Sequence, residues 1–403
     1  MDRKLRIAML SAHSCPVGKL GTKDTGGMSV YVRELARELG KCGHLVDVYT
    51  RVHDPKDRQI YELGPNARLI HLRAGENGEI HKLAVYSHLP DFARELENFR
   101  SRNRLQYDLV YSHYWLSAWV GRRLRDWWGV PHMVMFHTLG AVKNAIGVGE
   151  REPELRIKTE KCVVKNSHRI IAATEREKED LIRYYGASPG TIGVIPCGLN
   201  LELFQPVDRA TARQQLGLNG DKQVLYVGRI EPLKGVDKLL MAMTHLKDEP
   251  KARLLVIGGG ENSRREMERL RRLARELHIQ DSVTFQGVVR QEELPRFYSA
   301  ADVCVVPSYY ESFGLVALES LACGTPVVAT RVGGTESIIR QGETGYVVID
   351  NAPHHLADKI ARLLSRLNND AESVDLMRAS VVGFSWSVIA EAIAKECRAL
   401  LVN

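Results

Sequence analysis

Short runs of β-branched and aliphatic residues alternate with longer stretches of helical periodicity from one end of the chain to the other. Such alternation is typical of βαβ units, in which helices cover a parallel sheet. The strands expected in the first half span residues 5–13, 45–51, 68–73, 109–113, 133–137, 169–174 and 191–196. Those expected in the second half span residues 224–228, 253–258, 283–287, 303–307, 326–330 and 345–349. The pattern predicts an α/β protein with two Rossmann-like, parallel-sheet domains.

Residues 197–208 separate the two sets of strands and carry turn-forming residues at both ends, which favours an interdomain linker. A length of 403 residues also suits two domains, because single cores usually stop growing at roughly 250–300 residues. We place the boundary near residue 205, with an N-terminal domain over residues 1–204 and a C-terminal domain over residues 205–383. Residues 384–403 hold an apolar-periodic helix with no strand after it, and we expect this helix to cross back to the first domain.

The composition limits the class of protein and its partners. Apolar residues make up 44% of the chain and charged residues 26%, as in globular proteins. The longest apolar runs fall far short of the ~20 residues of a membrane helix, and the first ten residues lead into a strand rather than a signal peptide. The net charge of +7 is spread among acidic residues instead of forming a basic tail. We expect a cytoplasmic protein with neither nucleic-acid nor membrane partners, while a homodimer stays open.

Ligands of open parallel sheets bind beyond the carboxyl ends of the strands, so residues that follow strands are the first candidates for a site. After the first strand, a polar loop reaches Asp24-Thr25-Gly26-Gly27-Met28 and then an amphipathic helix. Adjacent glycines let the backbone approach an anion, and the helix N-terminus supplies free N–H groups. Gly26 and Gly27 therefore fit a diphosphate cradle as well as they fit an ordinary turn into a helix.

Cations and carboxylates follow strands of the second half. Arg229 and Lys234 lie between a strand and a helix, where two cations suit a diphosphate, although a solvated lysine is the alternative. Glu311 precedes another helix, and Glu319 lies about two turns into it, roughly 9 Å along its axis. A carboxylate on an otherwise apolar helix face is costly to bury unless it is paired. The two carboxylates predict binding of two sugar rings of one extended ligand, with a phosphate at the helix N-terminus between them.

Together these segments carry a family resemblance. D-T-G-G-M, G-R-I-E-P-L-K-G, E-S-F-G-L-x-x-L-E and G-T-P-V-V-A-T resemble the corresponding segments of the retaining GT-B glycosyltransferases of the glycosyl transferases group 1 family. The likeness extends over essentially the whole chain. It implies a cleft between the two domains, with a nucleoside-diphosphate sugar held by the second domain and an acceptor held by the first.

The resemblance implies roles for individual residues around the donor. Glu319 would hold the ribose hydroxyls, and Glu311 would hold hydroxyls of the donor sugar. His137 matches the family's active-site histidine, although a lone histidine at a strand end is more often structural. The implied catalytic residues are His137, Arg229, Lys234 and Glu311. The implied donor-binding residues are Gly26, Gly27, Gly258, Val288, Arg290, Ser312, Phe313, Gly314, Leu315 and Glu319.

The acceptor side resembles two kinds of enzyme within the family. Segments 111–117, 137–144 and 154–156 resemble those of an inositol-phosphate N-acetylglucosaminyltransferase. That likeness implies acceptor-binding roles for Lys82, Tyr114, Thr138, Lys143 and Arg156. Residues 24–27 and 137–140 also resemble sucrose-phosphate synthases, whose acceptor is fructose 6-phosphate. Both interpretations place a phosphorylated, sugar-like acceptor at the same site.

The implied reaction is the retaining transfer of a glucose-type sugar from a UDP-sugar. No D-x-D motif occurs, so no obligatory metal or cofactor is expected, while a divalent metal as an accessory to the acceptor or the product stays open. The seven cysteines form no C-x-x-C pair. No carboxylate clearly suits the role of nucleophile, so we expect front-face attack, with the leaving diphosphate taking the acceptor's proton.

Three other functions fit the sequence less well. A dinucleotide oxidoreductase is disfavoured because Gly258-Gly259-Gly260 lacks the third glycine of G-x-G-x-x-G. A non-catalytic nucleotide-binding module would not need the acceptor-side cations. A membrane-surface role for residues 119–128, which mix basic and aromatic side chains, is disfavoured because such a segment is more often a packed helix with a basic rim.

Overall fold

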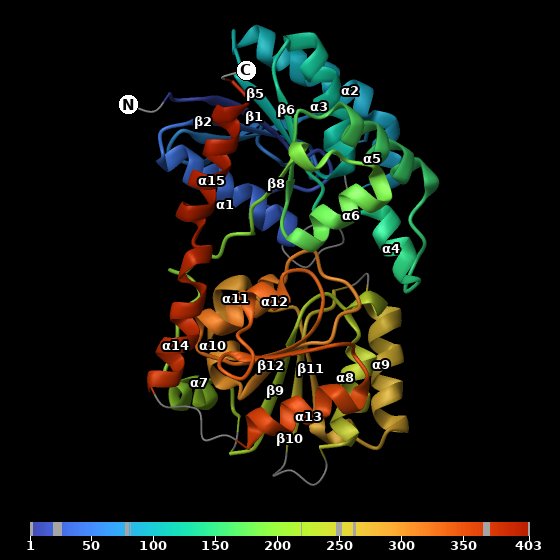
Figure 1. Ribbon diagram of the computed structural model, residues 1–403, viewed down its shortest axis with the longest axis vertical. Helices are drawn as coiled ribbons and strands as arrows, with labels where there is room; N and C mark the ends of the chain where they lie inside the picture. The colour runs from blue at the N-terminus through green and yellow to red at the C-terminus, as the bar shows by residue number, and fades with distance from the viewer. Residues whose placement is uncertain are drawn as a thin grey trace.

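The computed structural model of the chain describes residues 3–18, 26–76, 80, 82–218, 220–246, 252–260, 263–365 and 371–401, with Lys82 described in its backbone only. Two sheets organise the molecule, and they lie one above the other in Figure 1. We call the part around the first sheet the first half and the part around the second sheet the second half.

The first sheet has eight strands in the order β3-β4-β2-β1-β5-β6-β7-β8. All neighbours pair in parallel except β3, which runs antiparallel to β4 at the edge. The strands are β1 (Arg6–Leu10), β2 (Leu45–Arg51), β3 (Ile60–Gly64), β4 (Ala67–Leu72), β5 (Leu109–His113), β6 (His132–Met135), β7 (Arg169–Ala172) and β8 (Ile192–Val194).

The second sheet has six parallel strands in the order β11-β10-β9-β12-β13-β14. They are β9 (Lys222–Val227), β10 (Ala252–Ile257), β11 (Val283–Gly287), β12 (Val303–Val306), β13 (Val327–Thr330) and β14 (Gly345–Val348). Every strand expected from the sequence is present, so the predicted class of two parallel-sheet halves is confirmed. The boundary near residue 205 stays a prediction.

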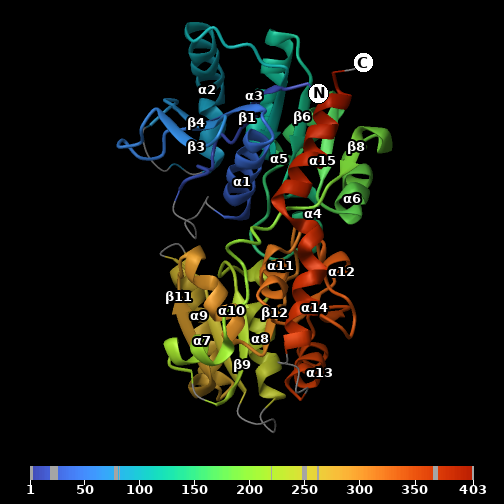
Figure 2. The ribbon, with the colours of Figure 1, turned by 90° about the vertical axis from the view of Figure 1, so that its left-hand side faces the viewer.

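Helices cover both sheets, as Figures 1 and 2 show from two directions. Those of the first half are α1 (Gly27–Lys41), α2 (Lys82–Arg102), α3 (Tyr114–Trp128), α4 (Gly140–Ile146), α5 (Glu154–Asn166) and α6 (Glu175–Tyr185). The second half carries α7 (Arg209–Gln215), α8 (Val236–Thr244), α9 (Arg264–Glu276), α10 (Leu294–Ala300), α11 (Leu315–Ala322), α12 (Thr335–Ile338), α13 (Pro353–Leu364) and α14 (Ala371–Val381). Among the described residues, no helix is both long enough and apolar enough to span a membrane.

The last helix, α15 (Trp386–Ala399), connects the halves. It rises from α14 along one side of the molecule and reaches the first half (Figures 1 and 2). Its first residue, Trp386, packs edge-on against Tyr31 of α1 at a ring distance of 5.3 Å. Near its end, Glu396 pairs with Arg169 of β7 at 2.7 Å. The helix therefore crosses back to the first half, as the sequence predicts.

The hydrophobic core is continuous between the halves. One cluster of buried residues includes Ile7 and Val32 of the first half, Phe313 and Leu318 of the second, and Ile389 of α15. Apolar burial contributes roughly 25 cal/mol per Å² of area removed from water, so this shared cluster favours one arrangement of the halves over separated ones. The strand ends that carry the candidate site are thereby held opposite each other.

Candidate active site

The carboxyl ends of the two sheets meet where the halves touch. A Cβ built on Gly27, the first residue of α1, would lie 3.3 Å from Cδ1 of Leu315, the first residue of α11. A Cβ built on Gly26 would have no neighbour within 4 Å among the described residues. The N-terminus of α1 therefore lies beside the N-terminus of α11. Asp24 and Thr25 of the predicted cradle lie outside the described residues.

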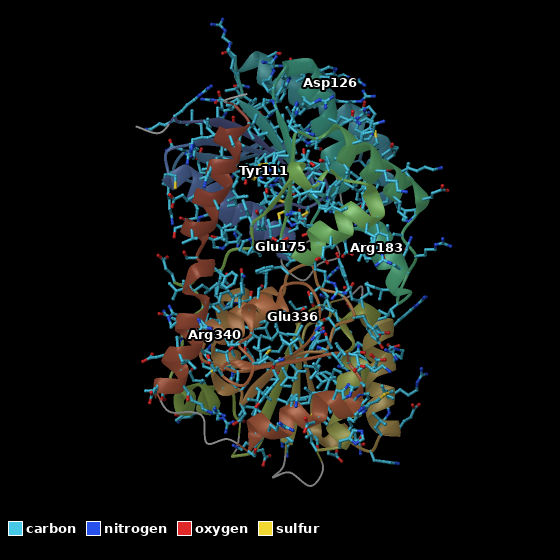
Figure 3. The ribbon with its side chains drawn as sticks, in the orientation of Figure 1. Tyr111, Asp126, Glu175, Arg183, Glu336 and Arg340 are labelled. Atoms are coloured by element: carbon cyan, nitrogen blue, oxygen red, sulfur yellow. The ribbon has the colours of Figure 1, made fainter. Side chains whose placement is uncertain are left out.

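Figure 3 shows where the halves face each other. Glu175 marks α6 at the lower end of the first half, and Glu336 marks α12 at the upper end of the second. Just after Glu175, the guanidinium of Arg176 donates a 3.0 Å hydrogen bond to the carbonyl oxygen of Arg331. On α1, Arg33 donates to the side chain of Gln291 at 3.4 Å. These contacts hold the strand ends of the two halves together.

Lys234 and Glu311, which the sequence predicts for the donor side, form an ion pair. The Nζ of Lys234 lies 2.7 Å from Oε1 of Glu311, and the hydroxyl of Ser308 donates to the same oxygen at 2.7 Å. Arg229 is half exposed and pairs with Glu231 at 3.0 Å. The structure thus brings together a cation and a carboxylate that the sequence predicts for different parts of one ligand. The ion pair fixes both side chains relative to each other.

Glu319 lies inside α11, partly buried among apolar neighbours. The hydroxyl of Tyr298 donates to its Oε2 at 2.7 Å. Burial raises the pKa of Glu319 to about 7, and the hydrogen bond from Tyr298 acts in the opposite direction. A carboxyl with this pKa exists in both protonation states near neutral pH, and a ligand hydroxyl can bind to either.

The loop that leads from Glu311 into α11 is held by backbone contacts. Gly314, which immediately precedes α11, has a φ of +115°, a conformation that L side chains rarely adopt. The N–H of Gly334 donates to the carbonyl oxygen of Phe313 at 2.6 Å. Phe313 is buried and Ser312 is partly buried. The predicted donor loop is therefore fixed in place beside Gly27.

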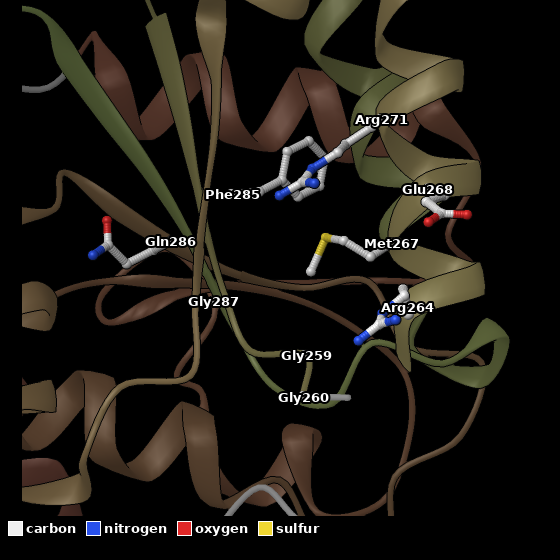
Figure 4. Close-up of a pocket in the computed structure, with 9 residues that line it drawn as sticks. All are labelled: Gly259, Gly260, Arg264, Met267, Glu268, Arg271, Phe285, Gln286 and Gly287. Atoms are coloured by element: carbon white, nitrogen blue, oxygen red, sulfur yellow. The ribbon is translucent and has the colours of Figure 1, made fainter. Parts of the chain in front are cut away.

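Gly258, Val288 and Arg290 gather at the edge of the second sheet, where β10 and β11 end. A Cβ on Gly258 would lie 1.8 Å from the carbonyl oxygen of Gly228, so the fold requires glycine there. Val288 and Arg290 are exposed. Beyond them lies a pocket of about 430 Å³ between α9 and β11, where Figure 4 shows Arg271 beside the ring of Phe285. Its lining consists of Gly259, Gly260, Arg264, Met267, Glu268, Arg271, Phe285, Gln286 and Gly287.

His137 follows β6 with a φ of +61°, which is uncommon for a residue other than glycine. Its Nε2 lies 3.0 Å from Nδ1 of the buried His113, and its ring packs edge-on against Tyr31 at 5.1 Å. Burial lowers the pKa of His137 to about 3 and also lowers the pKa of His113. Both imidazoles are therefore neutral at physiological pH, and one nitrogen of the contact donates to the other.

Arg156 is the central residue of the group that the sequence predicts for the acceptor side. Its Nη2 donates to the carbonyl oxygen of Thr138 at 2.7 Å and to the Thr138 hydroxyl at 2.9 Å. Its guanidinium lies over the ring of Tyr114 at 4.8 Å. The structure therefore unites Tyr114, Thr138 and Arg156, as the sequence predicts. The side chain of Lys82 lies outside the described residues.

The acceptor-side cations already have carboxylate partners. Arg156 is fully buried and pairs with Glu160 at 2.7 Å and with Glu152 at 2.9 Å. Lys143 pairs with Glu152 as well. The sequence analysis names the cations but not these carboxylates, so it overstates the free positive charge offered to a phosphate. The i, i+4 spacing of Glu152, Arg156 and Glu160 is the signal that identifies these ion pairs.

Sequence reasoning also missed two histidines of the site. The ring of His13, which follows β1, lies 4.5 Å from the ring of Tyr114, close enough to stack on it. His113 ends β5 and contacts His137. Both positions lie at carboxyl ends of parallel strands, where side chains from neighbouring strands converge. That rule, applied to each strand, would have found them.

Comparisons with known proteins agree with this geometry. Residues 25–203 match the family model described as Glycosyltransferase Family 4, and residues 208–373 match that of Glycosyl transferases group 1. The D-inositol 3-phosphate glycosyltransferase of Corynebacterium jeikeium is 41% identical over an alignment of 406 residues that covers 97% of this chain and 96% of that protein. The chain belongs to the group 1 glycosyltransferases. It is a glycosyltransferase with the GT-B fold, as predicted.

Two further similarities concern the kinds of enzyme within this family that the chain resembles. D-inositol 3-phosphate glycosyltransferase 2 of Catenulispora acidiphila is 40% identical over an alignment of 399 residues that covers 96% of this chain and 93% of that protein. The structure of sucrose-phosphate synthase from Thermosynechococcus elongatus matches with a TM-score of 0.90 at 36% identity, covering 99% of this chain and all of that one. Both kinds of enzyme that the acceptor-side segments resemble are therefore among the relatives.

Proposed function

We propose that this glycosyltransferase moves glucose or N-acetylglucosamine, with retention of configuration, from a UDP-sugar to a phosphorylated polyol or sugar, with an inositol phosphate as the first choice of acceptor. The observation that carries the proposal is the position of the Lys234–Glu311 pair on one side of the contact between the halves and of the Thr138–Arg156 pair on the other. One side can hold a charged donor, and the other can hold a hydroxyl-rich anion.

The diphosphate of the donor competes with carboxylates for the cations. When it binds, Lys234 and Arg229 exchange Glu311 and Glu231 for phosphate oxygens, and Glu311 becomes free to accept a sugar hydroxyl. Charge-assisted hydrogen bonds of this kind are worth roughly 1.5–3 kcal/mol each. The glycine backbone at Gly27 and the N-terminus of α11 add N–H donors from both halves. Glu319 is then the carboxyl for the ribose.

The acceptor anion is recognised by the cluster of Tyr114, Thr138 and Arg156. Because Glu152 and Glu160 balance the charges of Arg156 and Lys143, a phosphate bound there gains directed hydrogen bonds rather than a large excess of positive charge. Relatives at 40 and 41% identity act on D-inositol 3-phosphate by name, which favours an inositol phosphate. The likeness to sucrose-phosphate synthase makes fructose 6-phosphate the second candidate.

Transfer follows front-face attack in this proposal. The bond from the anomeric carbon to the diphosphate oxygen breaks, a hydroxyl oxygen of the acceptor bonds to the same face, and its proton passes to the departing diphosphate. Arg229 and Lys234 stabilise the charge that develops on the leaving group. His137, neutral because it is buried, orients the donor sugar without adding charge. We propose that no metal is obligatory, so chelation with EDTA should leave turnover intact.

A panel assay tests the function. The protein is incubated with UDP-glucose or UDP-N-acetylglucosamine and with inositol phosphate, fructose 6-phosphate, inositol or fructose, while UDP release and product mass are followed. We expect acceptor-dependent UDP release only with a phosphorylated acceptor, and an α-linked product by NMR. No acceptor-dependent release with any donor would refute the proposal, and release with fructose 6-phosphate alone would select the second candidate.

A single substitution tests the donor side. Lys234→Ala should weaken UDP-sugar binding about 10- to 100-fold, because one charge-assisted contact to the diphosphate is lost. Titration calorimetry with UDP-glucose and UDP-N-acetylglucosamine measures the dissociation constant. The matched control is Lys359→Ala, which removes a lysine that pairs with Asp358 at 2.8 Å on the outer helix α13. Unchanged donor binding in Lys234→Ala would mean that the donor site is elsewhere.

A further inference from the structure

Tyr310 belongs to the second half by sequence but packs into the first. It precedes Glu311 in the loop between β12 and α11. Its ring packs against the buried cluster of the first half that includes Leu139, Trp115 and Leu181. A side chain from the predicted donor loop thus packs against the hydrophobic core of the first half, near the residues predicted to bind the acceptor.

The hydroxyl of Tyr310 contacts the backbone of the acceptor loop. The N–H of Leu139 donates to it at 3.4 Å, at the long end of the hydrogen-bond range. Leu139 follows His137 and Thr138 directly in the chain. One side chain therefore joins the neighbour of Glu311 to the segment that carries the implied histidine and an acceptor-binding threonine.

Glu177 is a buried carboxyl group that acts on Tyr310 through its charge but forms no hydrogen bond with it. Glu177 of α6 accepts the N–H of Ala173 with Oε2 at 2.7 Å, while its buried Oε1 has no hydrogen-bond partner among the described residues. Burial and then the negative charge of Glu177 raise the pKa of the Tyr310 phenol. The adjacent Arg176 is already bound to the second half through Arg331.

We propose that Tyr310 is a positioning residue that aligns the acceptor loop with the donor loop. Its hydroxyl accepts the N–H of Leu139, and this bridge between the two loops sets His137 and Thr138 at a fixed distance from Glu311. Tyr310 itself touches neither substrate. Its effect on catalysis rests on the proposed function, whereas the bridge can be detected without any turnover.

The kinetic test compares two tyrosines that are adjacent in the chain. Tyr310→Phe should leave the dissociation constant of the UDP-sugar unchanged and lower kcat for transfer to the phosphorylated acceptor about tenfold, the equivalent of one hydrogen bond of about 1.4 kcal/mol. Slow hydrolysis of the donor by water should persist, so the ratio of transfer to hydrolysis falls. Tyr309→Phe, which removes the neighbouring hydroxyl, should behave as wild type.

A larger truncation of Tyr310 separates the role of the hydroxyl from that of the ring. Tyr310→Ala, which also removes the ring, should lower kcat more than Tyr310→Phe does. If Tyr310→Ala lost the activity while Tyr310→Phe kept all of it, the role would belong to packing of the ring, and the hydroxyl bridge would be overturned.

Hydrogen exchange tests the bridge independently of the reaction. In Tyr310→Phe, the amide of Leu139 should exchange faster than in wild type, while amides of β12 are unaffected, and Tyr309→Phe should show no change at Leu139. Unaltered exchange at Leu139 in Tyr310→Phe would overturn the proposal. If the wild-type protein transferred no sugar but exchange at Leu139 rose as expected, the bridge would stand and the proposed function would fail.

Discussion

At the scale of single residues, the site concentrates backbone conformations that most side chains avoid. His137 and Tyr114 have φ values of +61° and +74°, and they follow the neighbouring strands β6 and β5. Such conformations cost of order 1–3 kcal/mol and persist only where the surroundings impose them. His113 and Arg156, packed against these residues, supply that constraint. Two strained residues at the ends of neighbouring strands therefore make this strand edge a candidate for function, independently of any family likeness.

The raised pKa of Glu319 makes a prediction about pH. The usual pKa of a glutamate is about 4.5, and burial raises that of Glu319 to about 7. The folded chain therefore holds this proton more tightly than the unfolded chain, so the contribution to stability is fully present below pH ~4.5 and is lost as the pH rises through 7. The melting temperature of the ligand-free protein should fall between pH 5 and 8, and Glu319→Gln should flatten this fall.

Calorimetric melts at several pH values check the prediction. Glu343→Gln, which alters an exposed glutamate in a surface turn, is the control and should keep the wild-type slope. Glu177, with a pKa also raised to about 7 by burial, leaves a residual slope in the Glu319→Gln protein. If Glu319→Gln kept the full slope, the carboxyl would titrate normally in the folded state.

At the scale of elements, the sequence predicts most strands because their faces are buried. β12 and β13 are buried at every residue, so they read as uninterrupted apolar runs. β3 is the exception and was not predicted. Its first three residues are exposed, and only Leu63 is buried, so no apolar pattern marks it. A strand held mainly by its hydrogen bonds to β4 leaves little trace in the sequence.

The junction of linker and α15 offers a test of packing. A Cβ built on Gly198 would lie 2.3 Å from Cδ2 of Trp386, whose ring is buried against Tyr31. Gly198→Ala should therefore lower the free energy of unfolding by about 1–3 kcal/mol, the usual cost of overpacking. Chemical denaturation measures the change. The control is Gly190→Ala, where a Cβ meets nothing within 4 Å, and an equal effect of both substitutions would argue against the close approach.

At the scale of the whole molecule, the contacts between the halves were beyond sequence reasoning. The residue types of the donor and acceptor sides follow from strand ends and motifs, because parallel sheets place those positions together. Contacts such as Leu139 with Tyr310, or Arg176 with Arg331, depend on how one half is seated on the other. No periodicity or local spacing encodes that placement. Such contacts nevertheless set the distance between the proposed donor and acceptor sites. The linker must therefore keep the two halves in the arrangement in which these contacts form.

Arg378 of α14 holds the linker in place. Its guanidinium donates to the carbonyl oxygens of Leu201 and Phe204 in the linker at 2.9 and 2.8 Å, and to that of Ala322 at the end of α11 at 3.0 Å. Arg378→Met keeps much of the side-chain volume but leaves three carbonyl groups without this donor. We expect the linker to open more often, with faster cleavage by chymotrypsin after Phe204 and a loss of about 1–3 kcal/mol in stability.

The matched control for Arg378 is Arg340→Met, which alters an exposed arginine that lies 3.9 Å from Glu343, and it should leave the cleavage rate unchanged. Donor binding should survive in Arg378→Met, because Lys234, Glu311 and Glu319 all lie in the second half. Sugar transfer should fall, because it also requires the first half to stay seated. Equal cleavage of Arg378→Met and wild type would show that the shared core alone holds the halves together.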